Sequence, residues 1–267
     1  MEILSFRVSG KMGHFRKYYA NNTAFTYSIP PRTTLMGIVA AVMGLPKDSY
    51  YEDFASEKIN FGIRVLSPLK KSFHRLNFLS VKSIGDVTRN MSSDFRGEDG
   101  RIQTPFEIIS GWDIVKNDVV YQVFISATDI GSESFEKIKN HFLNKEPVYN
   151  VSLGAANFMA TISKIKLFKA SEIQEIKDED FVLIHSAIPI NIVEELKFDR
   201  EEYESYSFVE EDMLPGDFIA NHNREVRKMN KLLFSTTPNP LRVKLKGSYY
   251  QINKDTEKEL NIQFMDI

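Results

Sequence analysis

The chain has 267 residues, of which 42% are hydrophobic and 26% are charged, with a formal net charge of −2 and no cysteine. These values are typical of a globular protein with enough apolar residues for a sizeable core, and the lack of cysteine excludes disulfides, thiolate zinc sites and cysteine nucleophiles. A reducing, cytoplasmic location is expected. The longest apolar run, at 35–45, is too short to cross a bilayer, so no membrane association is expected.

Six elements are predicted in the first 170 residues. Alternating apolar and polar positions with β-forming residues predict strands, and helices are predicted where proline, threonine or serine can begin a 3.6-residue apolar pattern. The elements are a strand at 3–9, a helix at 30–46, strands at 59–67 and 119–128, a helix at 132–145 and a strand at 157–168. This order predicts an α+β fold of the ferredoxin-like, βαββαβ type, similar to an RNA recognition motif.

About fifty residues, 68–118, separate the second and third strands, where a hairpin turn would suffice. Long insertions in compact domains are uncommon and are usually functional or disordered. The alternation at 73–81 and the polar, glycine-containing stretch near residue 95 predict a protruding β-hairpin arm.

Short β-like runs separated by turn formers follow residue 170, which predicts a small β-rich C-terminal region at 171–267 after a first domain at 1–170. Charge is uneven along the chain. Residues 1–47 hold six Lys/Arg and one acid, a balance of +5, whereas 169–225 holds sixteen acids and five bases, a balance of −11. A polyanion would therefore meet the N-terminal surface, while the acidic segment is expected to be a solvated surface or a protein-docking one.

GHFRKYY, residues 13–19, combines an imidazole, two cations and three aromatic rings. Such a mixture suits nucleic-acid binding, because rings stack on bases and cations neutralise phosphates, although Phe15 and one tyrosine are equally expected as core anchors. Polar groups at Asn21, Asn22 and Thr26 can reach base edges or 2′-hydroxyls. Arg32, at the predicted helix start, suits an anion beside the free N–H groups.

No Walker loop, GxSxG elbow or histidine spacing typical of a metal site is present, and neither a metal nor another cofactor is expected. Metal-independent RNA cleavage stays open as an alternative, because a base, an acid and a cation can be assigned to His14, Tyr18 and Lys17, or to His74 and Lys71. Binding without cleavage needs fewer assumptions.

Residues 9–45, SGKMGHFRKYYANNTAFTYSIPPRTTLMGIVAAVMGL, resemble the N-terminal signature of the fifth family of CRISPR-associated proteins, especially its type I-B branch. DSYYEDF at 48–54, RIQTPFEII at 101–109 and the SLGAAN turn at 152–157 fit the same resemblance, which covers about the first 170 residues.

The resemblance implies a subunit at the foot of the Cascade complex in antiviral defence, with the inserted arm acting as a thumb. It implies that the chain holds the 5′ handle of the CRISPR RNA, touches the backbone subunit and the large subunit, and meets target DNA only indirectly. The implied RNA contacts near the first helix are His14, Phe15, Arg16, Lys17, Tyr18, Tyr19, Asn21, Asn22, Thr26 and Arg32. Those implied in the arm are Lys70, Lys71, His74, Arg75, Lys82, Arg89, Arg96 and Arg101.

The type I-C member of this family cleaves repeat RNA with a tyrosine, a lysine and a histidine, and no adjacent Lys-His pair is found here. We therefore expect a non-catalytic RNA-binding subunit, with a metal-independent repeat endoribonuclease as the alternative.

Overall fold

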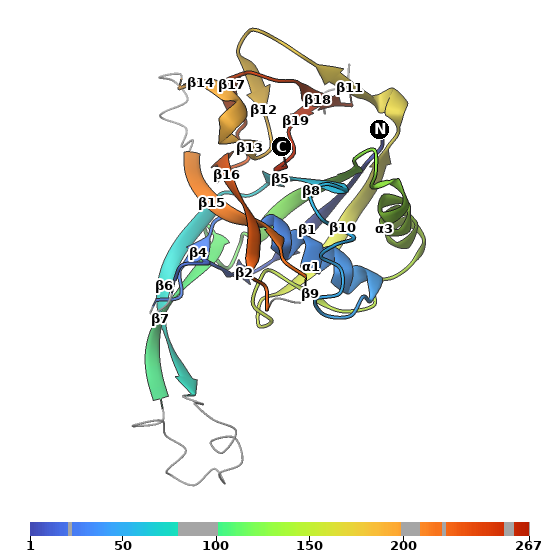
Figure 1. Ribbon diagram of the computed structural model, residues 1–267. Helices are drawn as coiled ribbons and strands as arrows, with labels where there is room; N and C mark the ends of the chain where they lie inside the picture. Colours follow the sequence, from blue (N-terminus) through green and yellow to red (C-terminus); the bar gives the residue numbers. More distant parts are fainter. Residues whose placement is uncertain (21–22, 80–100, 199–208, 221–222, 254–258, 267) are drawn as a thin grey trace.

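The computed structural model (Figure 1) describes residues 1–20, 23–79, 101–198, 209–220, 223–253 and 259–266. A five-stranded sheet lies at the centre of the fold, in the order β5-β8-β1-β10-β9. Its strands are β1 (Ile3–Gly10), β5 (Ile59–Val65), β8 (Val119–Ala127), β9 (Val151–Ser152) and β10 (Met159–Phe168). Neighbouring strands are antiparallel, so β1 and β5 point the same way with β8 between them.

Two α-helices occur in the described part of the chain, α1 (Arg32–Met43) and α3 (Ser132–Asn144). Both pack on one face of the sheet, where alternate residues of β1, Leu4, Phe6 and Val8, are fully buried with them in the main core. Successive side chains of a strand point to opposite faces of the sheet. The pattern that predicted the strand therefore also determines which face the helices cover.

The opposite face of the sheet is covered over only part of its area. Ile3, Phe124 and Phe168 are buried there against Ile252, Ile262 and Phe264 of the C-terminal region. Further along the same face Arg7 is exposed, which leaves this end of the sheet open.

Helix α1 begins after two prolines and ends at Gly44, which has φ +73° and donates its backbone N–H towards the carbonyls of Ala40 and Ala41. Glycine is favoured at this left-handed position because it has no Cβ to crowd the backbone. The helix predicted at 30–46 is confirmed, with two residues trimmed at its start and three at its end.

The described part of the insertion at 68–118 contains two paired antiparallel strands. Its strands are β6 (Leu69–Leu79) and β7 (Arg101–Gly111), which pair along their whole lengths and extend away from the body of the molecule (Figure 1). Between the predicted strand at 3–9 and the predicted helix at 30–46, the described residues contain three two-residue strands. These are β2 (Met12–Gly13), which pairs with β7, and β3 (Phe15–Arg16), which pairs with β4 (Thr26–Tyr27).

The C-terminal region is β-rich, as expected, and forms three small sheets in the orders β11-β18-β19, β12-β17-β14 and β13-β16-β15. Its strands are β11 (Ile173–Ile176), β12 (Val182–Ile184), β13 (Ile188–Pro189), β14 (Val193–Lys197), β15 (Val209–Phe218), β16 (Val226–Ser235), β17 (Leu241–Leu245), β18 (Tyr249–Ile252) and β19 (Leu260–Ile262). Short 3₁₀ turns occur at Ala170–Glu172 and Ile190–Ile192.

These elements confirm an α+β fold dominated by strands. Leu214, Phe234 and Met265 of the C-terminal region lie in the same buried cluster as α1 and the central sheet. Among the described residues, no helix is long and apolar enough to span a membrane.

His185 lies between β12 and β13, where the segment meets β5 through a hydrogen bond from the Ala187 amide to the Ile63 carbonyl. Its Nδ1 lies 3.2 Å from the carbonyl oxygen of Asn261. Burial, reinforced by the positive charge of Arg64, lowers the pKa of His185 from 6.5 to about 4. The folded chain therefore holds this ring in its neutral form at pH 5 to 7.

We expect the free energy of unfolding to fall by about 2 kcal/mol between pH 7 and pH 5 because of His185 alone. In that window the unfolded ring binds a proton and the folded ring does not, so acid favours the unfolded state. Urea unfolding at both pH values measures the change in the wild type and in His185→Gln. The variant should lose about 2 kcal/mol less than the wild type, and His74→Gln, at an exposed position, serves as control. Equal losses in wild type and His185→Gln would contradict the assignment.

Candidate nucleic-acid interface

The GHFRKYY segment runs from β2 through β3 and stands beside the SLGAAN turn. The amide of His14 donates to the Leu153 carbonyl at 2.9 Å, and the His14 carbonyl accepts from the Ala155 amide at 3.2 Å. Gly154 sits between these two bonds with φ +88°, where an added Cβ would lie 1.9 Å from the His14 carbonyl oxygen. Gly154 therefore permits a close approach of two backbones, and the backbone that it meets belongs to the candidate site itself.

The His14 side chain is 4% exposed. Its Nδ1 lies 2.7 Å from the Glu107 carbonyl oxygen of the arm, and its ring stacks on Phe106 with centroids 4.0 Å apart. Burial lowers the pKa of His14, although the Glu107 carbonyl opposes this shift, and the charge of Arg16 lowers it further. The ring is thus neutral near pH 7, and it fixes the arm to the segment.

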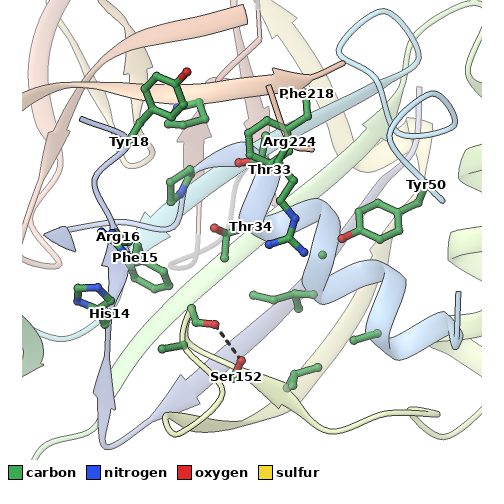
Figure 2. Close-up of a pocket in the computed structure, with 18 of the residues that line it drawn as sticks. His14, Phe15, Arg16, Tyr18, Thr33, Thr34, Tyr50, Ser152, Phe218 and Arg224 are labelled. Carbon is green, nitrogen blue, oxygen red and sulfur yellow. Dashed lines mark hydrogen bonds between the residues drawn. The ribbon is translucent and has the colours of Figure 1, made fainter. Parts of the chain in front are cut away.

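A pocket of about 600 Å³ opens beside this segment, at the first turns of α1 (Figure 2). Arg16 and Tyr18 line it from the GHFRKYY segment, and Arg224 from the β15–β16 connection reaches over α1 towards Thr34. The remaining lining residues are His14, Phe15, Pro31, Thr33, Gly37, Ile38, Ala41, Tyr50, Tyr51, Phe106, Asn150, Val151, Ser152, Gly154, Ala155, Pro215 and Phe218. None of these described lining residues is an aspartate or a glutamate. Outside the lining, Nε of Arg224 lies 3.0 Å from Oδ1 of Asp48, so part of the Arg224 charge is already neutralised. The remaining positive charge, together with that of Arg16, still favours an anion in the pocket.

The start of α1 adds to this preference. The N-cap residue, Pro31, provides no side-chain cap, and the first turn holds no acid. The side chain of Thr33 is 7% exposed and makes no hydrogen bond to any described residue. Free amides at a helix N-terminus carry partial positive charge, so a phosphate is stabilised there.

Three predicted contacts lie at the surface. Tyr18 and Tyr19 are 58% and 62% exposed, and Arg16 is exposed with its Nη2 donating to the Ala20 carbonyl at 3.1 Å. Phe15 is buried beside Tyr121 and also lines the pocket, and its burial agrees with the core-anchor alternative. Asn21 and Asn22 lie outside the described residues.

Arg32 corrects the sequence-based expectation, because its guanidinium is completely buried and cannot touch RNA. Nη1 lies 2.6 Å from Oδ1 of Asp217, and Nε lies 2.7 Å from Oδ1 of Asp266. Nη2 donates to the carbonyls of Phe54 and Ile59 at 2.7 and 2.6 Å. The first residue of α1 thus joins three distant parts of the chain and has a structural role.

Thr26 requires the same correction. It is fully buried, its hydroxyl accepts from the Phe15 amide at 2.8 Å and donates to the Tyr27 carbonyl at 2.9 Å, and its amide donates to Oε2 of Glu107 at 2.8 Å. These bonds hold β3, β4 and the arm together, so no polar atom of this side chain is left for a nucleotide.

The acidic segment explains why other cations are not free. Lys17 lies 2.6 Å from Asp212, and Lys71 lies 3.3 Å from Glu210. Together with Asp217, these acids come from β15, which packs on α1. Part of the segment expected as a solvated or protein-docking surface therefore neutralises bases of the N-terminal half. Arg224 belongs to the same segment. The sequence analysis missed it because the summed charge of residues 169–225 is strongly negative.

In the arm, Lys70, His74 and Arg75 are exposed. Lys70 lies over the Trp112 ring at 5.8 Å, and the hydroxyl of Ser72 lies 3.1 Å from Nε2 of His74. Lys82, Arg89 and Arg96 lie outside the described residues, as does the side chain of Arg101. The arm contacts the loop before β4 through Phe73 and Phe25, whose centroids are 5.7 Å apart.

The described residues contain no cluster of three or more His, Asp or Glu side chains able to hold a metal ion. His14, Tyr18 and Lys17 come from one segment, but the Lys17 amine is engaged by Asp212 and the His14 Nδ1 by a carbonyl. The residues assigned to a cleavage mechanism are therefore close in sequence, but His14 and Lys17 each already contact a different group of the protein.

Comparison with known proteins gives a family match and distant structural likenesses. A search of curated proteins finds no match. A CRISPR protein from Archaeoglobus fulgidus superposes with a TM-score of 0.53 at 12% identity, over 95% of this chain and 97% of that chain. A chain of a solved "CRISPR RNA-guided surveillance complex" gives a TM-score of 0.47 at 14% identity, over 91% of each chain. The family model described as "CRISPR-associated protein (Cas_Cas5)" matches residues 3–187. That match covers more than half of the sequence, and the chain therefore belongs to the Cas5 family of CRISPR-associated proteins.

Proposed function

We propose that this chain is a non-catalytic RNA-binding subunit of a type I CRISPR effector complex, of the Cascade type and the I-B branch, and that it holds the 5′ handle of the CRISPR RNA. The observation that carries the proposal is the pocket of about 600 Å³ lined by Arg16, Arg224 and the start of α1, with no carboxylate among its described lining residues. Family membership supports a role in CRISPR defence, and the strand order β5-β8-β1-β10 supports a ferredoxin-like core.

A nucleotide of the handle would be held by two kinds of contact. Its phosphate would meet the guanidiniums of Arg16 and Arg224 and the free amides of α1, which act as charge-assisted donors. A neighbouring base would stack on the exposed ring of Tyr18, where each stack contributes about 1–3 kcal/mol. None of these contacts requires bond cleavage.

The proposed partners are the CRISPR RNA handle, the backbone subunit and the large subunit of the complex, with target DNA met only indirectly. We keep residues 1–170 as the proposed RNA-binding domain, with its arm as the thumb, and 171–267 as the smaller β-rich region. The separation of the arm from the body supports its use as a contact surface (Figure 1).

Metal-independent cleavage of repeat RNA is the alternative, and one observation favours it: His14 is held neutral at the pocket, as a general base must be. Incubation of the protein with labelled repeat RNA in EDTA distinguishes the two functions. We expect retained but intact RNA. Cleavage that disappears in His14→Ala would replace the binding proposal with the alternative.

We expect the double variant Arg16→Ala/Arg224→Ala to bind handle RNA roughly 30-fold more weakly, because two charge-assisted contacts are lost. The log–log salt dependence of binding should flatten by about 1.4, at roughly 0.7 for each phosphate contact. Fluorescence anisotropy with labelled handle RNA measures both quantities, in the free subunit and in the assembled complex.

The matched control is Lys177→Ala/Lys246→Ala, which removes two exposed charges from the C-terminal region that pair with no described residue. If the pocket variant and this control bind with equal affinity, the pocket is not the handle site.

A further inference from the structure

The open end of the central sheet, on the face opposite α1, carries a row of positive side chains. Gln122 of β8 pairs with Arg7 of β1 on one side and with Arg64 of β5 on the other. Residues paired directly across a sheet project from the same face. Arg7, Gln122 and Arg64 therefore form a continuous row, which we call the sheet-face row.

Its location follows from the alternation of the strands. Phe124 lies two residues after Gln122 on β8, and Gly62 lies two residues before Arg64 on β5. The C-terminal segment that contains Phe264 covers Phe124 and Gly62. The sheet-face row begins where this cover ends. Arg7 is exposed and Arg64 is half-buried beside the edge of the covered part.

No acid in the described part of the chain neutralises the row. Neither Arg7 nor Arg64 makes a hydrogen bond or an ion pair with any described residue, and the buried Nε of Arg64 is unpartnered. Burial lowers the pKa of Arg64, and the nearby charge of Arg7 lowers it further. Buried polar atoms are paired in nearly all proteins, so an orphaned guanidinium atom beside a second guanidinium indicates a missing anion.

The neighbouring side chains indicate which anion would fit. Gln122 donates to the hydroxyl of Ser5 at 3.0 Å, and Ser163 of β10 pairs with Arg7. Ser5 is buried, so its hydroxyl only orients the Gln122 amide, whereas Ser163 is exposed. The backbones of Arg7 and Arg64 are two strand spacings, about 10 Å, apart, with the Gln122 amide between them and the Ser163 hydroxyl beside Arg7, and this spacing of two guanidiniums suits a phosphodiester strand. A protein partner would instead favour an interface with an apolar, aromatic-rich centre, and none of Arg7, Gln122, Arg64, Ser5 and Ser163 is apolar.

We propose that the sheet-face row is a second nucleic-acid site, which binds the phosphate backbone of a single strand without reading its sequence. No aromatic residue belongs to the row, so base stacking is not part of this contact. The row lies on the opposite face of the sheet from α1 and its pocket, and the proposal does not depend on the pocket holding the handle.

The test uses labelled single-stranded oligo-uridine RNA of 20 nucleotides with the full chain, at 50 and 200 mM salt. We expect Arg7→Gln/Arg64→Gln to bind about five- to tenfold more weakly at 50 mM salt and to flatten the log–log salt dependence by about 1.4. The matched control, Lys177→Gln/Lys246→Gln, should bind within twofold of the wild type. An affinity and salt dependence equal to those of the control would overturn the proposal.

Two further measurements test whether Arg64 is a structural residue and whether an acidic protein occupies the row. Arg64→Gln should have a melting temperature no lower than that of the wild type, because it removes an unpaired charge. A lower melting temperature would mean that Arg64 stabilises the fold and would overturn its assignment to the site.

The second measurement uses an oligo-glutamate peptide. If Arg7→Gln/Arg64→Gln loses binding of this peptide but keeps RNA binding, the row belongs to an acidic protein and the proposal is overturned. Handle-RNA binding by Arg16→Ala/Arg224→Ala reports on the pocket alone.

Discussion

Replacement of Arg32 by methionine is expected to lower the free energy of unfolding by about 3–5 kcal/mol, a large part of the total stability of a typical domain. The cause is the pair of buried carboxylates that the substitution leaves without a cation. Asp217 and Asp266 are 3% and 8% exposed, and without the guanidinium both carboxylates stay buried without their cation.

Lysine should not rescue the Arg32 position. The guanidinium reaches two carboxylates and two carbonyl oxygens on different sides, and a single ammonium group cannot match that geometry. Urea unfolding, or the yield of soluble protein where a variant fails to fold, measures the effect. Arg227→Met is the matched control, because Arg227 is paired with Glu57 at the surface and its loss should cost less than about 1 kcal/mol.

Removing the carboxylates as well should recover part of the loss. We expect Arg32→Met/Asp217→Asn/Asp266→Asn to be more stable than Arg32→Met alone, because uncharged amides are less costly to bury. If Arg32→Met were as stable as the wild type, the ion pairs of Arg32 with Asp217 and Asp266 would contribute nothing to the stability of the folded state.

The second large effect is expected for Gly154→Ala, which should weaken handle-RNA binding more than tenfold and destabilise the fold by about 2 kcal/mol or more. The added Cβ would lie 1.9 Å from the His14 carbonyl oxygen, and the backbone φ of +88° is unfavourable for any other residue. The turn must move away from His14, which breaks the two backbone bonds that form one wall of the pocket.

Melting temperature and handle-RNA affinity measure this effect together. Gly247→Ala provides the control, because its added Cβ meets no atom within 4 Å. A Gly154→Ala protein with unchanged affinity would mean that the turn does not shape the RNA site.

The sequence was sufficient for features that depend on local pattern. Strand β1, helix α1 and the arm follow from alternation, from the proline-rich start and glycine end, and from the length of the insertion. The SLGAAN turn at 152–157 was also identified, although the contact of its Gly154 with His14 could not be.

Features that depend on distant partners could not be predicted. Arg32 resembles an anion-binding residue in its local sequence, and only the fold shows that Asp217, 185 residues further along, occupies it. The same applies to Lys17 and Asp212, 195 residues apart. Summed charge over a segment predicted an attractive N-terminal surface, yet part of that charge is neutralised within the chain.

The buried Arg32 also has a consequence for synthesis on the ribosome. When α1 leaves the exit tunnel, Asp217 has not yet been translated, and the arginine must stay hydrated until it has. The N-terminal half is therefore expected not to complete its core as a nascent chain. Folding of this protein is expected to be largely post-translational, and a nascent chain arrested before Asp217 should remain open to proteases.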